Sequence, residues 1–310
     1  MRTVRQSRRW NGLVLAGAVM AASALASPAA AQARLDARYV VTLAGLPIGE
    51  GSWLITVDEA DYSATATGTT TGLMRAFTGG YGQTITHGTV QGGKPVLSSY
   101  TASIHSYKKA DEIRLKVDGG AVRELRLDPP AETEAERVPV TEASKRGVLD
   151  PMTATLIRMP GQGDPMTPEA CARTLAVFDG RLRYDLRLSY KRTDQVKADK
   201  GYAGPAVVCA VNFTPVAGYI PTRAAIKYLS EQRDMEIWLV PIAGTRVLVP
   251  FRAEGPTPIG RAILQATEFV TTATAPKAPD TVKASIKPRD KAAKAAASES
   301  KASASESNTP

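Results

Sequence analysis

The sequence predicts a mainly β protein: one large antiparallel sheet, strongly curved or closed into a half-open barrel, with one or two short helices. Three observations predict this fold. Apolar and polar residues alternate over many short segments, as they do in half-buried strands. Glycine-containing turns separate these segments. Only two segments have the composition of a short helix. The predicted sheet has about fourteen strands, and twisted open sheets of that size usually curl or close.

The N-terminus predicts a cleaved signal peptide at residues 1–31. Four arginines precede an apolar run from Leu13 to Leu25, and small residues ending at Ala31 follow it. A charged segment, a short apolar segment and a small-residue cleavage site, in this order, are typical of secretory signals. The run is shorter than the ~20 residues of a membrane-spanning helix. We expect cleavage after Ala31, with Ala33 as the second choice, and a periplasmic mature protein without a transmembrane segment.

Residues 35–275 are expected to form the β-rich domain. In its first half, the turn Asp118-Gly119-Gly120 predicts a hairpin, because Asp-Gly and Gly-Gly are strong turn formers. The predicted elements of this half are the strands Tyr39–Leu43, Gly51–Val57, Tyr62–Thr70, Gln83–Val90, Val96–Ser106, Glu112–Val117 and Val122–Leu127, and a short helix at Leu73–Phe77.

A polar connection at Pro129–Val140 leads to the second half. There, a helix is predicted from Asp150, as N-cap, to Met159, with Pro151 in its first position. Asp179-Gly180 predicts a hairpin turn before the most regularly alternating strand. The predicted strands are Thr174–Phe178, Leu182–Tyr190, Val207–Phe213, Arg223–Tyr228, Met235–Val240, Arg246–Phe251 and Arg261–Val270. Each half could form its own sheet, but we expect one continuous sheet with the helix against its concave side.

The charge is concentrated at the two ends of the chain. The formal net charge is +9, but four of these charges are arginines of the predicted signal peptide, and residues 276–310 carry a net +3. This Ala/Lys/Ser-rich tail is predicted to be disordered, since it has too few apolar residues to offset the entropy of ordering. A nucleic-acid-binding protein instead clusters its basic residues on a folded face. No nucleic-acid partner is therefore expected.

Two cysteines, Cys171 and Cys209, predict a structural disulfide, because the expected compartment is oxidising. Metal binding is the alternative. The two histidines, His87 and His105, have no metal-ligand spacing to the cysteines. We therefore predict neither a metal site nor a cofactor.

No catalytic set is recognisable in the sequence. The candidate polar site consists of Asp179, Arg181, Arg183 and Asp185, in which carboxylates could act as acid or base and arginines could orient an anion. Each has a structural alternative: Asp179 is also the expected turn residue, and Asp185 could pair with its arginine neighbours along the strand.

Aromatic residues on or beside the predicted strands suggest a groove for a lipophilic ligand. The alternative is that they fill the core of a large sheet. These residues are Tyr81, Tyr100, Tyr107, Tyr184, Tyr190, Tyr202, Tyr219, Tyr228, Trp53 and Trp238.

Several motifs together resemble an exported proteobacterial family, domain of unknown function 3108. The longest is Val177–Leu186, with Cys171 before it and Cys209 after it. The others are Tyr39–Gly49, Asp150–Ala154, Tyr202–Pro205, Pro215–Tyr219, Trp238–Pro241 and Pro256–Gly260. The resemblance implies a β-rich periplasmic envelope protein, similar to an envelope-integrity group with a spiral sheet and an internal disulfide. It implies no activity and no catalytic residues.

The sequence thus favours a non-enzymatic periplasmic protein of cell-envelope maintenance that binds a lipid or other lipophilic ligand in a concave β groove. The alternatives are a carboxylate-dependent periplasmic enzyme and a scaffold that docks an envelope complex. The sequence does not separate ligand binding from scaffolding.

Overall fold

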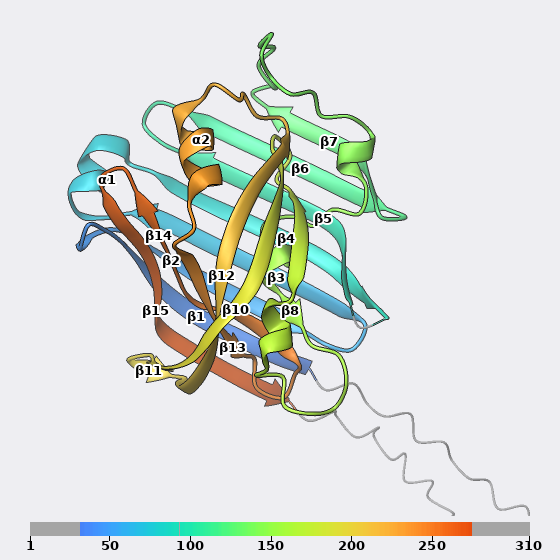
Figure 1. Ribbon diagram of the computed structural model, residues 1–310, viewed down its shortest axis with the longest axis vertical. Coiled ribbons are helices and arrows are strands. Elements are labelled where there is room, and N and C mark those ends of the chain that lie inside the picture. The colour runs from blue at the N-terminus through green and yellow to red at the C-terminus, as the bar shows by residue number, and fades with distance from the viewer. Residues whose placement is uncertain (1–31, 93, 275–310) are drawn as a thin grey trace, which may run out of the picture. The chain divides into compact units, whose positions relative to one another are not determined.

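The computed structural model describes residues 32–92 and 94–274, in which fifteen strands form a single sheet (Figure 1). The predicted signal peptide and tail lie outside the described residues. Thirteen strands follow the order β7-β6-β5-β4-β3-β2-β1-β15-β14-β13-β12-β10-β9, while β11 pairs with β15 and β8 with β14. All pairings are antiparallel except that of β11 with β15. The predicted mainly β fold is confirmed.

The strands are β1 Gln32–Leu43, β2 Leu46–Val57, β3 Asp61–Thr70, β4 Tyr81–Gln91, β5 Lys94–His105, β6 Ala110–Asp118, β7 Ala121–Asp128, β8 Ile157–Arg158, β9 Arg173–Phe178, β10 Arg183–Lys197, β11 Lys200–Gly201, β12 Ala203–Ala217, β13 Met235–Pro241, β14 Val247–Thr257 and β15 Gly260–Thr274. The helices are α1 Gly72–Thr78 and α2 Ala224–Glu231, with short 3₁₀ turns at Ala143–Lys145, Thr153–Thr155 and Pro168–Cys171. No helix of the described residues is long and apolar enough to cross a membrane.

The first and last strands join the two halves at the centre of the sheet. β1 pairs with β15 over its whole length, from Gln32 opposite Thr274 to Leu43 opposite Ala262. The expected continuous sheet is therefore present, and the polar connection after β7 does not divide it.

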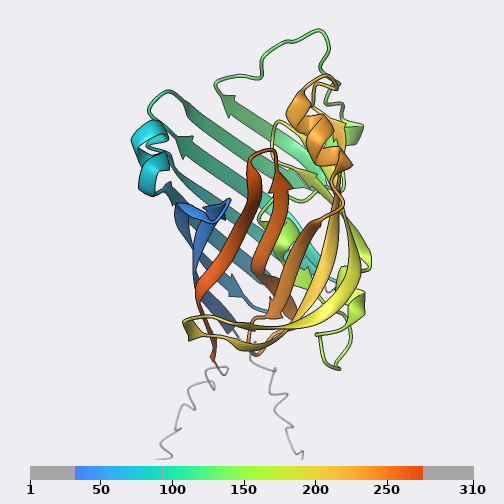
Figure 2. The ribbon, with the colours of Figure 1, turned by 60° about the vertical axis from the view of Figure 1, so that its left-hand side comes forward.

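The sheet curls, so that its C-terminal strands lie across the face of its N-terminal strands (Figures 1 and 2). The largest apolar cluster lies between these layers and includes Leu35, Ile55, Val208, Val240 and Phe251, all nearly or fully buried. The Tyr39 hydroxyl also crosses it to donate a hydrogen bond to the carbonyl of Pro250, at 2.7 Å. Burial of apolar side chains from both halves holds the curl in place.

The two edges of the curled sheet meet at the turn between β9 and β10. Gly180 has a φ of +102°, and a Cβ added there would lie 2.4 Å from Cγ2 of Ile113 on β6. Arg181 extends from the same turn to Asp111 on β6, at 2.7 Å, and to the carbonyl of Pro129, at 2.8 Å. The sheet is therefore not closed into a barrel by strand pairing, and side-chain contacts hold its two curled ends together here.

The predicted helix from Asp150 to Met159 is wrong. The chain makes one 3₁₀ turn, Thr153–Thr155, and then the short strand β8. Leu156 packs into the cluster between the layers, while Met159 packs into a second cluster around the disulfide. An irregular segment can present apolar side chains to both sides, whereas a helix with a single apolar face cannot.

The predicted strand Arg223–Tyr228 is also wrong, because α2 occupies this segment. Ile226 and Leu229 are half-buried and three residues apart, which places them on one face of a helix. The other predicted helix, Leu73–Phe77, is confirmed as α1.

Candidate functional site: a basic cavity beside strand β9

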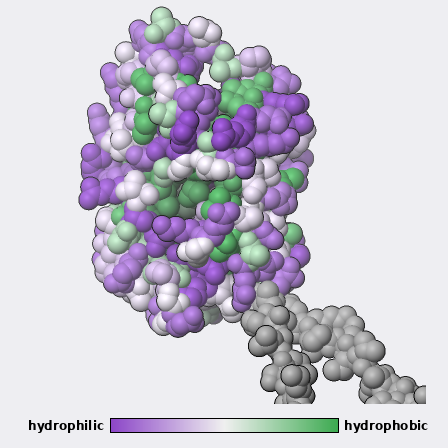
Figure 3. Space-filling model, turned by 90° about the vertical axis from the view of Figure 1, so that its right-hand side faces the viewer, coloured by the Kyte–Doolittle hydropathy of each residue, from purple (hydrophilic) through white to green (hydrophobic). Residues whose placement is uncertain are grey.

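A cavity of about 810 Å³ opens beside β9, between the β4–β5 turn and the irregular segment that follows Gly147. It is lined by Gly92, Lys94, Pro95, Gly147, Leu149, residues 156–162, residues 173–176 and Arg246. Figure 3 shows the face that lies on the right in Figure 1, where an apolar hollow is surrounded by polar side chains. Ligand sites in proteins commonly have volumes of about 300–1,000 Å³.

Four cations line this cavity: Lys94, Arg158, Arg173 and Arg246. None of them forms an ion pair with a carboxylate of the described residues. The Arg246 guanidinium instead donates hydrogen bonds to backbone carbonyls, and its Nε lies 3.1 Å from the carbonyl oxygen of Met159. The cavity therefore carries a concentrated positive charge, which attracts anions.

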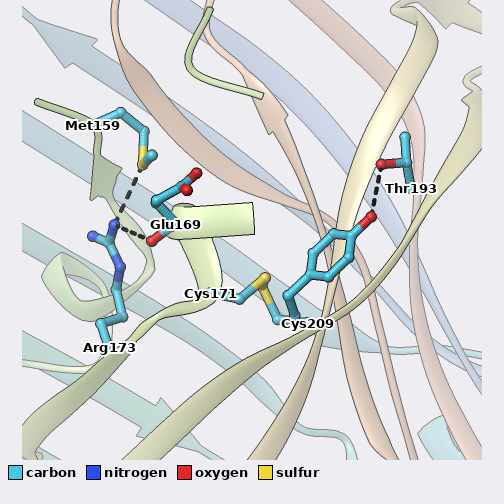
Figure 4. Close-up of a disulfide and its surroundings, with 7 residues drawn as sticks. Met159, Glu169, Cys171, Arg173, Thr193 and Cys209 are labelled. Carbon is cyan, nitrogen blue, oxygen red and sulfur yellow. Dashed lines mark hydrogen bonds between the residues drawn. A yellow bond between two sulfur atoms is a disulfide. The ribbon is translucent and has the colours of Figure 1, made fainter. Parts of the chain in front are cut away.

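Arg173 is the most confined of the four cations. Its guanidinium donates to the carbonyls of Arg158, at 3.4 Å, and Glu169, at 3.3 Å, and contacts the sulfur of Met159 (Figure 4). Its Nε is buried and has no hydrogen-bond partner among the described residues. Burial lowers the pKa of this guanidinium, which nonetheless remains protonated at neutral pH, as arginine does in proteins. An anion in the cavity would offset part of this desolvation.

The disulfide positions Arg173. Cys171 and Cys209 are bonded, with their Cα atoms 5.5 Å apart, so the predicted disulfide is confirmed (Figure 4). Both cysteines are fully buried, and the bond attaches the 3₁₀ turn before β9 to strand β12 in the sheet. Arg173 follows Cys171 by two residues and is fixed at the cavity wall.

Strand β9 also turns backbone donors toward the cavity. Leu149 forms two backbone hydrogen bonds of 2.8 Å with the outer edge of β9: its N–H donates to the carbonyl of Ala176, and its carbonyl accepts the N–H of Phe178. Because backbone groups alternate along a strand, the N–H groups of Thr174 and Ala176 point to the same side, away from β10. Both residues line the cavity, where their N–H groups can bind an anion together with the arginines.

The apolar part of the wall is formed mainly by Leu149, Leu156, Ile157 and Leu175. A narrow, mostly apolar pocket of about 70 Å³ shares Ile157 and Leu175 with the cavity and is lined by residues of β9, β10, β12 and β13. The site therefore combines an apolar wall with cationic and N–H donors, which suits a ligand that has an apolar part and an anionic group.

A buried polar cluster fixes the segment that forms this wall. Asp150, fully buried, accepts hydrogen bonds from the N–H groups of Met152 and Thr153, at 2.9 and 3.2 Å, and from the hydroxyls of Thr86 and Thr153. The Tyr62 hydroxyl lies 2.8 Å from that of Thr153. Burial raises the pKa of the Asp150 carboxyl, and these hydrogen bonds offset part of the rise. Asp150 thus fixes this segment to strands β3 and β4.

The four residues of the predicted polar site lie in the β9–β10 turn and at the start of β10. The Asp179 carboxylate accepts the N–H groups of Arg181 and Leu182, at 2.8 and 2.7 Å, and so shapes the turn. Arg181 forms an ion pair with Asp111 on β6. Arg183 and Asp185 pair with each other on β10, at 2.7 Å. In this arrangement each of the four has a structural partner.

The basic cavity is not lined by the aromatic residues that the sequence suggested for a ligand groove. Trp53, Tyr100 and Trp238 are buried in the core, while Tyr81 and Tyr107 are largely exposed. No described residue that lines the basic cavity is aromatic. Sequence reasoning missed its cations, because they lie on four separate segments that only the folded sheet brings together.

The fold and the cavity define a disulfide-linked protein with one curled sheet and a basic ligand-sized cavity. The chain belongs to the family described as protein of unknown function DUF3108, whose model matches residues 38–267. No curated protein matches the sequence. Among solved structures it is similar to the β-barrel-like protein of domain of unknown function DUF1849 from Brucella abortus, at 8% identity. The match has a TM-score of 0.42 and covers 79% of this chain and 98% of that one.

Proposed function

We propose that the protein is a non-enzymatic periplasmic protein of cell-envelope maintenance, and that it holds an anionic lipophilic ligand in the basic cavity. One observation carries this proposal: four cations without carboxylate partners among the described residues surround a cavity that is apolar along one wall. An acyl or similar apolar group would lie along Leu156, Ile157 and Leu175, with its acidic group near Arg158 and Arg173.

The expected compartment is supported by two features. The N-terminal sequence has the order of segments of a secretory signal, and a buried disulfide is typical of proteins that fold in an oxidising environment.

Native mass spectrometry of the protein recovered from the periplasm, before and after organic extraction, tests the proposal directly. We expect an excess mass that extraction removes and that oleate, but not oleyl alcohol, restores. Failure of oleate and of phosphatidylglycerol to bind the extracted protein would contradict the proposal.

A charge variant tests the site. The side chains of Lys94 and Arg158 form no hydrogen bond with a described residue, so replacing them removes no such contact from the fold. We expect Lys94→Gln/Arg158→Gln to fold normally and to bind oleate at least tenfold more weakly. The matched control is Arg34→Gln/Lys197→Gln, which neutralises two exposed cations outside the cavity. Equal binding by both variants would place the ligand elsewhere.

The alternative of a carboxylate-dependent enzyme depends on Asp185. Its pairing with Arg183 is a structural use of that carboxylate. Asp185→Asn should therefore leave the protein functional in a strain that needs it, whereas loss of function with normal folding would favour the enzyme.

A further inference from the structure

The most exposed large apolar side chains lie at one end of the sheet. Ile259, Tyr107 and Leu46 are 72%, 69% and 67% exposed, more than any other large hydrophobic residue of the described part. Each lies in or beside a different hairpin turn: β14–β15, β5–β6 and β1–β2. Single exposed apolar residues are common on protein surfaces, whereas a contiguous group of them marks an interaction site.

These turns are at the same end because of the strand directions, and α1, which connects β3 to β4, lies there too. We call residues 44–48, 71–79, 106–109 and 257–261 the turn end. Its members are contiguous, because three backbone hydrogen bonds of 3.0 Å connect them in a row: Ala44 to Arg261, Thr71 to Ile48 and Tyr107 to Thr78.

The turn end is basic as well as apolar. Arg75, Lys108, Lys109 and Arg261 are exposed on it, and Arg261 forms an ion pair with Glu254. The four segments contain no aspartate or glutamate. Exposed apolar and aromatic side chains surrounded by cations have the chemistry of surfaces that bind the head-group region of an anionic bilayer.

We propose that the turn end docks on an anionic lipid bilayer, with Leu46, Tyr107 and Ile259 inserted among the head groups and Arg75, Lys108 and Lys109 facing the lipid phosphates. The charge favours this occupant over a second copy of the chain, whose own turn end would bring cations against cations. The docking does not depend on the basic cavity, because none of the residues that line the cavity belongs to the turn end.

The test is co-sedimentation of the full mature chain with vesicles of phosphatidylethanolamine and phosphatidylglycerol at 3:1, compared with vesicles of phosphatidylcholine alone. We expect binding to the anionic vesicles that weakens with salt, and little binding to the neutral ones. Neutralising the three cations, in Arg75→Gln/Lys108→Gln/Lys109→Gln, should weaken binding on the order of a hundredfold, because each cation near an anionic surface contributes about fivefold.

The apolar variant is Leu46→Ser/Tyr107→Ser/Ile259→Ser, which we expect to bind at least tenfold more weakly while keeping its unfolding midpoint. Its control is Tyr190→Ser/Val216→Ser, which removes two exposed apolar side chains outside the turn end. The control for the charge variant is Arg34→Gln/Arg187→Gln/Lys197→Gln. All variants keep the basic tail, so its attraction to the vesicles is the same in each.

Two results would overturn the proposal: the chain fails to bind the anionic vesicles, or both turn-end variants bind them like their controls. If the chain fails to bind and light scattering shows a dimer that only the apolar variant dissociates, the partner of the turn end is another copy of the chain. Loss of oleate binding by the cavity variant with normal vesicle binding would separate this proposal from the proposed function.

Discussion

Breaking the bond between Cys171 and Cys209 is expected to destabilise the fold substantially. The two cysteines are 38 positions apart, so the bond closes a loop of moderate length in the unfolded chain. The chain-entropy relation gives a stabilisation of about 4 kcal/mol for such a loop. For a domain of this size, each kcal/mol shifts the melting temperature by roughly 2–4 °C, so the melting temperature should fall by about 8–16 °C.

Urea unfolding of three samples measures this effect: the oxidised protein, the protein reduced in place, and the variant Cys171→Ala/Cys209→Ala. The reduced protein keeps both sulfur atoms, so it reports the loss of the cross-link alone. The alanine variant also loses the packing of two fully buried side chains and should be the least stable. If the free energies of unfolding of the reduced and oxidised proteins differ by less than about 1 kcal/mol, the disulfide does not restrict the unfolded chain as the chain-entropy relation requires.

Three further predictions concern the buried polar cluster around Asp150 and the seam, by which we mean the contacts of Gly180 and Arg181 in the β9–β10 turn with β6. Gly180→Ala should destabilise the fold by more than about 2 kcal/mol in urea unfolding, because φ is positive and the new Cβ would overlap Ile113; the control, Gly68→Ala, has normal φ and no atom closer than 3.9 Å and should be far milder. Arg181→Ala should cost roughly 1–2 kcal/mol, since it removes a partly exposed ion pair and a bond to a carbonyl, and an unchanged midpoint would mean that the seam does not need it. Asp150 has a raised pKa in the folded protein, so it contributes most to stability below its unfolded pKa of about 3.8, and this contribution is lost as pH rises through the folded pKa. The difference in unfolding free energy between wild type and Asp150→Asn should therefore change between about pH 3 and pH 7, and a constant difference would refute the raised pKa.

The hairpins were predictable from the sequence because their signals are local. Asp179-Gly180 combines an aspartate that accepts backbone N–H groups with a glycine that adopts a φ of +102°. Neither feature depends on distant residues, so the turn and the strands beside it could be placed correctly.

Two segments were predicted wrongly because their outcome depends on tertiary packing. Residues 224–229 fit strand alternation through Ile226 and Tyr228, and helix spacing through Ile226 and Leu229. The local pattern fits both. At residues 150–159, Asp150 does accept the N–H groups expected of a helix cap. The chain nonetheless leaves the helical conformation at Leu156, because Leu156 packs into the cluster between the layers and Met159 into the cluster around the disulfide.

The candidate site was the least predictable part. Arg158 comes near Arg246 because β8 pairs with the start of β14, where Arg158 lies opposite Val247. Arg173 approaches the same place through the disulfide. No sequence pattern marks these cations as neighbours, whereas Asp179, Arg181, Arg183 and Asp185 are close in sequence and drew attention for that reason.

The pairing of β1 with β15 has a consequence for the order in which the protein folds. A ribosome makes Gln32 first and its partner Thr274 more than two hundred residues later, so the central ladder of the sheet must wait for the last strand. Until then each half exposes a long unpaired strand edge, which is prone to associate with other chains. Contacts of such high sequence separation also slow folding. A chain that ends before β15 should thus accumulate as an aggregation-prone intermediate that needs a chaperone, and only the complete chain can shield both edges.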